Sequence, residues 1–103
     1  MELTVLTVPD CPNGPLLEER LAVALAGIPV SSVTRRVIAD EREAARWGMR
    51  GSPTLLVDGV DPFACEGAPA SMSCRIFRDG HGRTEGAPSV PALRRALTPN
   101  PSA

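Results

Sequence analysis

The segment Leu3-Thr-Val-Leu-Thr-Val8 runs directly into Pro9-Asp-Cys-Pro-Asn-Gly14, and this junction decides the predicted fold. The first six residues are rich in β-branched side chains and are apolar on both alternating faces. Such a run is typical of a central strand that is buried on two sides. The next six residues interrupt the strand, and a helix is predicted at residues 15–26. Cys11 is therefore expected where a strand gives way to a helix.

The remaining elements are predicted from apolar spacing and capping signals. Leu17, Leu21 and Leu25 recur at every fourth position, which gives the first helix one apolar face. The other predicted elements are a strand at residues 30–38, a short helix capped by Asp40 and Glu43, strands at residues 54–57 and 71–78, and a final helix capped by Ser89. Residues 60–70 are predicted to form an irregular insertion. The order β-α-β-α-β-β-α fits an α/β fold with a four-stranded mixed sheet and flanking helices.

Length and charge limit the class of protein. The 103 residues fit a single domain, which we place at residues 1–97 and follow with a flexible tail at residues 98–103. The net charge of −1 argues against a nucleic-acid-binding surface. No apolar run approaches the roughly 20 residues of a membrane helix, and the first residues lack a signal-peptide pattern. We therefore expect a cytoplasmic protein without nucleic-acid or membrane partners.

The chain contains three cysteines, Cys11, Cys65 and Cys74. In a chain of this kind they are more typical of reduced thiols, metal ligands or redox groups than of a secretory disulfide framework. Backbone N–H groups at a helix start favour a thiolate over a thiol, so Cys11 is the leading candidate nucleophile. The adjacent negative charge of Asp10 opposes that effect. The alternative is that Cys11 is a partly buried, unreactive residue.

Two motifs stand at related positions in the predicted fold. Cys11-Pro-Asn-Gly14 follows the first strand, and Gly51-Ser-Pro-Thr54 precedes the third. In this arrangement the chain resembles the thioredoxin superfamily, in which a Cys-x-x-Cys motif after the first strand faces a cis-proline before the third. The resemblance implies a thioredoxin-like fold in which Pro53 is cis. It also implies that Pro12, Ser52 and Pro53 bind substrate opposite Cys11.

The chain departs from this pattern at Gly14, where the second cysteine of the redox pair is missing. The motif then supports monothiol chemistry, unless a resolving thiol comes from elsewhere. Cys74 is the next candidate, although alternation also allows it to be a small core residue. Thioredoxin topology places the start of the fourth strand away from Cys11, so only the insertion or an unusual strand register would bring Cys74 near. Cys65 could pair with either thiol or remain unpaired.

Three further segments carry a narrower resemblance: Cys11-Pro-Asn13, the run from Gly51 to Gly59, and Ser73-Cys-Arg75. They are similar to segments of small bacterial thioredoxin-like proteins that include selenocysteine-containing relatives. Some of these proteins are labelled as related to organomercurial lyases. That label implies cysteines that cleave a carbon–mercury bond by protonation, although this chain is much shorter than a full organomercurial lyase.

Our leading hypothesis is a thiol-dependent oxidoreductase, active as a monothiol enzyme on a thiol or disulfide substrate or partner protein and without a cofactor. The alternatives are a non-enzymatic module that binds a soft metal, a metalloid or a partner protein through its thiols, and organomercurial cleavage. No built-in zinc site is expected, because the cysteines lack short Cys-x-x-Cys spacing. His81, in a glycine-flanked turn, is predicted to be a solvated surface residue, and Trp47 to pack on the core.

Overall fold

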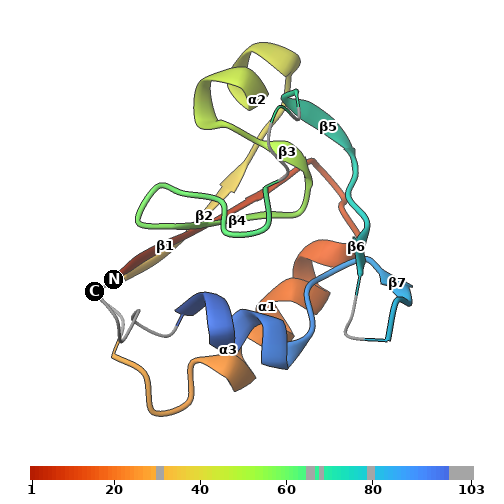
Figure 1. Ribbon diagram of the computed structural model, residues 1–103. Helices are drawn as coiled ribbons and strands as arrows, with labels where there is room; N and C mark the ends of the chain where they lie inside the picture. Colours follow the sequence, from red (N-terminus) through yellow and green to blue (C-terminus); the bar gives the residue numbers. More distant parts are fainter. Residues whose placement is uncertain (30–31, 65–66, 68, 79–80, 98–103) are drawn as a thin grey trace.

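The computed structural model describes residues 1–29, 32–64, 67, 69–78 and 81–97 (Figure 1). The elements in these ranges are β1 (Glu2–Thr7), α1 (Asn13–Ala24), β2 (Ser32–Val37), α2 (Glu41–Trp47), β3 (Arg50–Ser52), β4 (Thr54–Val57), β5 (Ser71–Cys74), β6 (Phe77–Arg78), β7 (Thr84–Glu85) and α3 (Val90–Leu97). The predicted mixed α/β class is confirmed. Among the described residues, none of the helices has the length and apolar character that crossing a membrane requires. The predicted tail at residues 98–103 lies outside these ranges.

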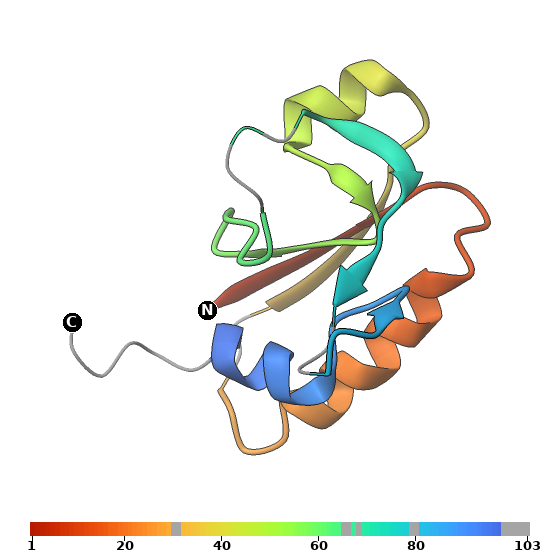
Figure 2. The ribbon, with the colours of Figure 1, turned by 45° about the vertical axis from the view of Figure 1, so that its right-hand side comes forward.

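Strand β1 forms the centre of the main sheet. It pairs in parallel with β2 and antiparallel with β4, so that Val5 lies between Arg35 and Leu55. Helix α2 covers one face of the sheet, and α1 and α3 cover the other (Figures 1 and 2). Leu3 and Leu6 point to opposite faces of β1, and both are fully buried. The prediction of a central strand buried on two sides is therefore confirmed.

The two strands beside β1 also lie where the sequence predicts them. Strand β4 has the predicted bounds. Strand β2 lies within the predicted residues 30–38, of which residues 30 and 31 are outside the described ranges. All six residues of β2 are exposed, which fits an edge strand that carries Arg35 and Arg36.

Helix α1 buries the leucine face that its spacing predicts. Leu17 and Leu21 lie in the core, and Leu25 packs against its edge. The helix runs from Asn13 to Ala24 and so begins and ends two residues earlier than predicted. Pro15 is then the third helical residue, where a backbone N–H would have no partner within the helix. A proline there does not prevent the earlier start.

The other two helices are capped as predicted. For α2, Asp40 Oδ1 accepts the N–H of Glu43 at 2.8 Å. For α3, Ser89 Oγ accepts the N–H of Ala92 at 3.2 Å. Trp47, at the end of α2, is half-buried against the core on that face of the sheet, which confirms its predicted packing role.

The strand predicted at residues 71–78 does not become the fourth strand of the main sheet. It is divided into β5, which pairs in parallel with β3, and β6, which pairs with β7. Within the described residues, the main sheet therefore has three strands rather than the predicted four.

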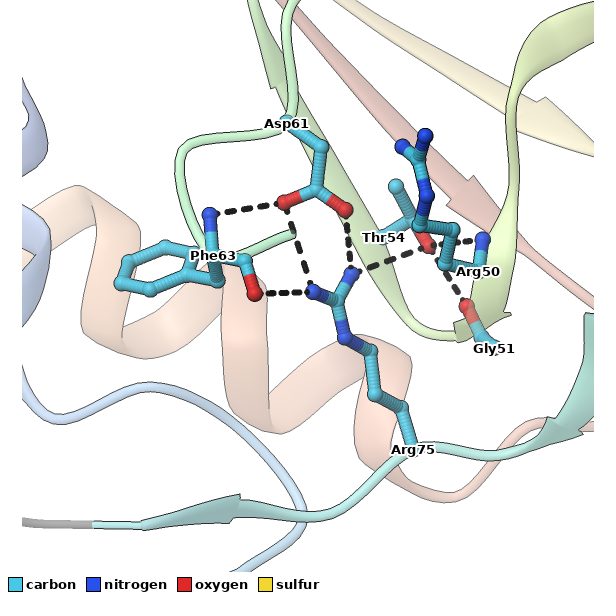
Figure 3. A network of polar contacts seen from close by, with 6 residues as sticks. All are labelled: Arg50, Gly51, Thr54, Asp61, Phe63 and Arg75. Atoms are coloured by element: carbon cyan, nitrogen blue, oxygen red, sulfur yellow. Dashed lines mark hydrogen bonds and ion pairs between the residues drawn. The ribbon is translucent and has the colours of Figure 1, made fainter. Parts of the chain in front are cut away.

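Arg75 explains this difference, because its side chain is drawn into a polar network (Figure 3). The guanidinium donates to Asp61 Oδ2 at 2.6 Å and to Phe63 O at 2.9 Å. The side chain of Asp61 is fully buried, so its charge requires a partner inside the protein. The backbone N–H of Arg75 donates to Ser52 O at 3.0 Å. These contacts hold residue 75 against β3 and the insertion rather than along β4.

Candidate functional site

Cys11 lies in the turn between β1 and α1. Its N–H donates to Val8 O at 3.2 Å, and Asp10 has a φ of 59°, in the left-handed region, which closes the turn. Helix α1 begins two residues after Cys11, with the exposed Pro12 as its N-cap residue. The thiol of Cys11 is half-buried and free. The predicted position between a strand and a helix is confirmed, although Cys11 precedes the first helical turn.

Ser52 joins the end of β1 to the junction of β3 and β4. Its Oγ accepts the N–H of Val8 at 3.1 Å, and Val8 O in turn accepts the N–H of Cys11. Ser52 and Pro53 are both buried, and the peptide bond between them is cis, as the resemblance implies. Because the Ser52 hydroxyl is bonded to Val8, that side chain positions the turn. Both residues are less than 2% exposed.

The structure brings Cys74 to this same junction. In the parallel pairing of β3 and β5, Cys74 lies opposite Ser52, after a local shift in register. The side chain of Cys74 is exposed and its thiol is free. The sequence analysis named an unusual strand register as one condition for proximity to Cys11, and the pairing of β3 with β5 contains a shift in register. Cys74 is paired with Ser52, and the N–H of Cys11 is bonded to Val8, whose own N–H donates to Ser52 Oγ. Cys65 lies outside the described residues.

Gly51 permits the close approach of β5. Its φ is +116°, and a Cβ atom at this position would lie 2.9 Å from Arg75 Cβ and 3.1 Å from Ser73 O. A side chain here would be strained by the backbone and would also collide with the neighbouring strand. The sequence analysis gave Gly51 no role. The sequence feature that could have pointed to Gly51 is its position next to Ser52 in the Gly-Ser-Pro motif.

Gly14 occupies the position of the missing second cysteine. It is buried at the start of α1, and a Cβ atom there would lie 3.1 Å from Thr7 Cγ2. The methyl group of Thr7 therefore fills the space that a cysteine side chain would enter. The departure from the Cys-x-x-Cys pattern is matched by the packing around it.

The first turn of α1 is held against the segment between β7 and α3. The side chain of Asn13 lies against Gly86, where a Cβ atom would be 2.3 Å from Asn13 Cγ. Arg20 donates to both carboxylate oxygens of Glu85, at 3.2 and 3.0 Å, and to Ala87 O at 3.1 Å. These contacts support the turn that carries Cys11. Sequence patterns do not reveal them, because the partners are more than 60 residues apart.

Few charged groups are available at this junction. The guanidinium of Arg75, the chain neighbour of Cys74, is bonded to Asp61. Asp10 is an exposed carboxylate next to Cys11. Across the described ranges, no three His, Cys, Asp or Glu residues are grouped so that they could hold a metal ion.

Comparison of the chain with protein-family models, with curated protein sequences and with solved structures found no match in any of the three.

Proposed function

We propose that this chain is a thioredoxin-like thiol–disulfide oxidoreductase in which the thiolate of Cys11 is the attacking group. Strand β1, parallel to β2 across α1 and antiparallel to β4, supports the thioredoxin-like arrangement. The observation that carries the proposal is that Cys11 and Ser52 are both hydrogen-bonded to Val8. This shared attachment holds the thiol turn beside the segment that leads into β4.

The first step is thiol–disulfide exchange. The Cys11 thiolate attacks one sulfur of a substrate disulfide, a mixed disulfide forms, and the other half of the substrate leaves as a thiolate. Cys11 is half-buried and its thiol is free, and the step requires that its sulfur reach the substrate from solvent. Electrons move between sulfur atoms only, so the step requires no cofactor.

The second step requires another thiol, and Cys74 is our candidate for it. Its thiolate attacks the Cys11 sulfur, the second half of the substrate leaves as a thiolate, and a Cys11–Cys74 disulfide forms. An external dithiol then reduces this disulfide and is oxidised to a disulfide itself. The electron pair thus passes from the dithiol to the substrate. The step requires the two Cα atoms to come within about 7 Å of each other.

The residues around Cys11 have different parts in this proposal. Ser52 is a positioning residue, since its hydroxyl is bonded to Val8. Pro53 is fully buried, so its part is to position the segment that leads into β4. Pro12 is exposed and forms the rim of the site next to Cys11.

Turnover of 2-hydroxyethyl disulfide by dithiothreitol tests the proposal. Cys11→Ser is expected to abolish turnover above the uncatalysed rate, because the attacking sulfur is gone. In a single-turnover reaction without dithiothreitol, Cys74→Ser is expected to accumulate the mixed disulfide on Cys11, which mass spectrometry detects as an added 2-hydroxyethylthio group. Cys65→Ser is the matched control and should behave as the native chain.

Alkylation of the reduced native protein, measured at each cysteine against pH, gives a second readout. We expect Cys11 to react fastest of the three thiols. Activity that survives in Cys11→Ser would disprove the proposal. Activity that is lost in Cys65→Ser but kept in Cys74→Ser would assign the second step to Cys65 instead.

A thiol-based module for a soft metal ion is the second candidate. It is favoured by two free thiols on segments that are each linked to Ser52, together with Gly14 in place of a second motif cysteine. Thiolates are preferred ligands of soft cations. Tight binding of one mercuric ion or one arsenite per chain, without disulfide turnover, would support this function. Release of methane from methylmercury would instead support organomercurial cleavage.

A further inference from the structure

A groove lies between α3, β6 and the turn at residues 62–63, with a volume of about 810 Å³. This volume falls within the range of small-molecule sites, roughly 300–1,000 Å³. Four arginines line the groove together with aromatic, proline and small apolar side chains. We refer to it as the arginine groove, and the residues that the argument uses are Phe63, Arg75, Ile76, Phe77, Arg78 and Arg95.

The inner wall of the arginine groove is rigidly held (Figure 3). Arg75 is 10% exposed and forms its ion pair with Asp61, a further bond to Phe63 O and a contact with Thr54 Oγ1. Its guanidinium also lies over the ring of Phe77, 4.8 Å from the centroid. Since Asp61 neutralises it, Arg75 contributes shape and little net charge to the groove.

Two other arginines contribute positive charge. Arg78 on β6 and Arg95 in the last turn of α3 are both exposed and line the arginine groove. Neither has an ion-pair partner among the residues that the structure describes. No carboxylate belongs to the lining of the groove. A ligand that lies there therefore meets uncompensated guanidinium groups, which bind carboxylates in bidentate fashion.

The apolar side of the arginine groove is equally defined. Phe63 and Phe77 form an edge-to-face pair with ring centroids 5.8 Å apart. Ile76 is 70% exposed, the most exposed of the large apolar side chains in the described chain. Without a ligand, the exposed side chain of Ile76 is in contact with water. A ligand with an apolar group would cover this surface, and removing it from water would favour binding.

We propose that the arginine groove binds a small organic monocarboxylate with an aromatic or branched aliphatic body. The carboxylate would pair with Arg78 and Arg95, and the body would cover Ile76 and the edge of Phe63. Charge complementarity excludes cations, and the apolar lining disfavours inorganic anions, which would leave Ile76 exposed. This inference is independent of the thiol chemistry, because none of its contacts involves a cysteine.

Titration of the ¹⁵N-labelled full chain with 2-naphthoate at low salt tests the proposal by NMR. We expect saturable shifts at the amides of residues 76–78 and 92–96. Arg78→Gln/Arg95→Gln is expected to weaken binding about tenfold, the loss of two solvent-exposed ion pairs. 2-Naphthalenemethanol, which has the same body without the charge, should bind the native chain about tenfold more weakly for the same reason.

The matched control is Arg42→Gln/Arg46→Gln, which removes two exposed arginines from α2, across the sheet from α3. It should leave naphthoate binding unchanged. If both double variants lose the same affinity for naphthoate, the loss comes from the change in net charge and not from the arginine groove, and the proposal is overturned. Absence of saturable shifts, equal affinity for the alcohol, or full competition by millimolar inorganic phosphate would overturn it as well.

Discussion

The part of the chain that ends with α2 and the part that follows it are stabilised in different ways. In the first part, strands of six residues pair along their length, and leucines pack on both faces of β1. In the second part, β3, β5, β6 and β7 have between two and four residues each. Arginine side chains hold these short strands in place, Arg75 through Asp61 and Arg20 through Glu85. Individual polar contacts therefore decide the path of these short strands.

This difference locates the site on the boundary between the two parts. Cys11 follows the long strand β1, whereas Cys74 ends the short strand β5. The turn that holds Cys11 is flanked by β1 and α1, and many apolar contacts fix these two elements, each with a small contribution to stability. The position of Cys74 depends on the pairing of β5 with β3, which Arg75 and Gly51 control. Substitutions at those two residues should therefore affect the second thiol more than the first.

The largest effect is expected from Arg75→Met. It leaves the fully buried carboxylate of Asp61 without its partner, which should lower the free energy of unfolding by about 3–5 kcal/mol. Urea denaturation followed by circular dichroism measures this loss. The double variant Asp61→Asn/Arg75→Met, which removes both charges, should lose less than Arg75→Met alone. A loss no larger than that of the exposed-site variant Arg78→Met would break the comparison.

The next effect concerns Gly51→Ala. Backbone strain at a φ of +116° and the approach to Arg75 Cβ should together lower the free energy of unfolding by about 3 kcal/mol. Gly59→Ala is the matched control, because Gly59 also has a positive φ of 84° but meets nothing within 4 Å. It should cost only about 1 kcal/mol, from the backbone alone.

The same pair of variants tests the second thiol. If β5 is displaced, oxidation of reduced Gly51→Ala should form less Cys11–Cys74 disulfide than oxidation of Gly59→Ala. Peptide mapping by mass spectrometry measures the yield. Equal yields in the two variants would show that the approach of Cys74 does not depend on Gly51.

The smallest effect is expected in the first part, at the missing second cysteine. Gly14→Cys should cost about 1 kcal/mol, because its Cβ meets the methyl group of Thr7 at 3.1 Å. Thr7→Ser removes that methyl group, so the double variant Thr7→Ser/Gly14→Cys should recover the loss. A double-mutant cycle from urea denaturation measures the coupling. Additive losses would mean that Thr7 does not limit the space at position 14.

Most of the first part of the fold could be predicted from the sequence. The apolar run before Cys11, the leucine spacing of α1 and the cap Asp40 are local signals, and each describes an observed element. In the second part, the cap Ser89 of α3 is a signal of the same kind. They act over at most one or two turns of chain, so they need no knowledge of distant residues. The turn position of Cys11 follows from the same signals.

The candidate site could be predicted only in part. The Gly-Ser-Pro motif pointed to Ser52 and Pro53, but their burial and the bond from Ser52 Oγ to Val8 were not predictable from spacing. Alternation left open whether Cys74 is a core residue or a functional thiol. Its exposure, and its place opposite Ser52, came from the pairing of β5 with β3.

The sequence by itself determined the α/β alternation, the central strand, the helix faces and caps, and the turn that holds Cys11. These features depend on periodicity and capping, which involve only residues that are close together in the chain. Only the tertiary structure decided that residues 71–78 leave the main sheet. That choice depends on a buried carboxylate at Asp61, which requires the guanidinium of Arg75, 14 residues along the chain. Periodicity does not report on such a pairing, because the free energy comes from burying two opposite charges together. Because Cys74 is the chain neighbour of Arg75, this ion pair also fixes the position of Cys74 at the end of β5.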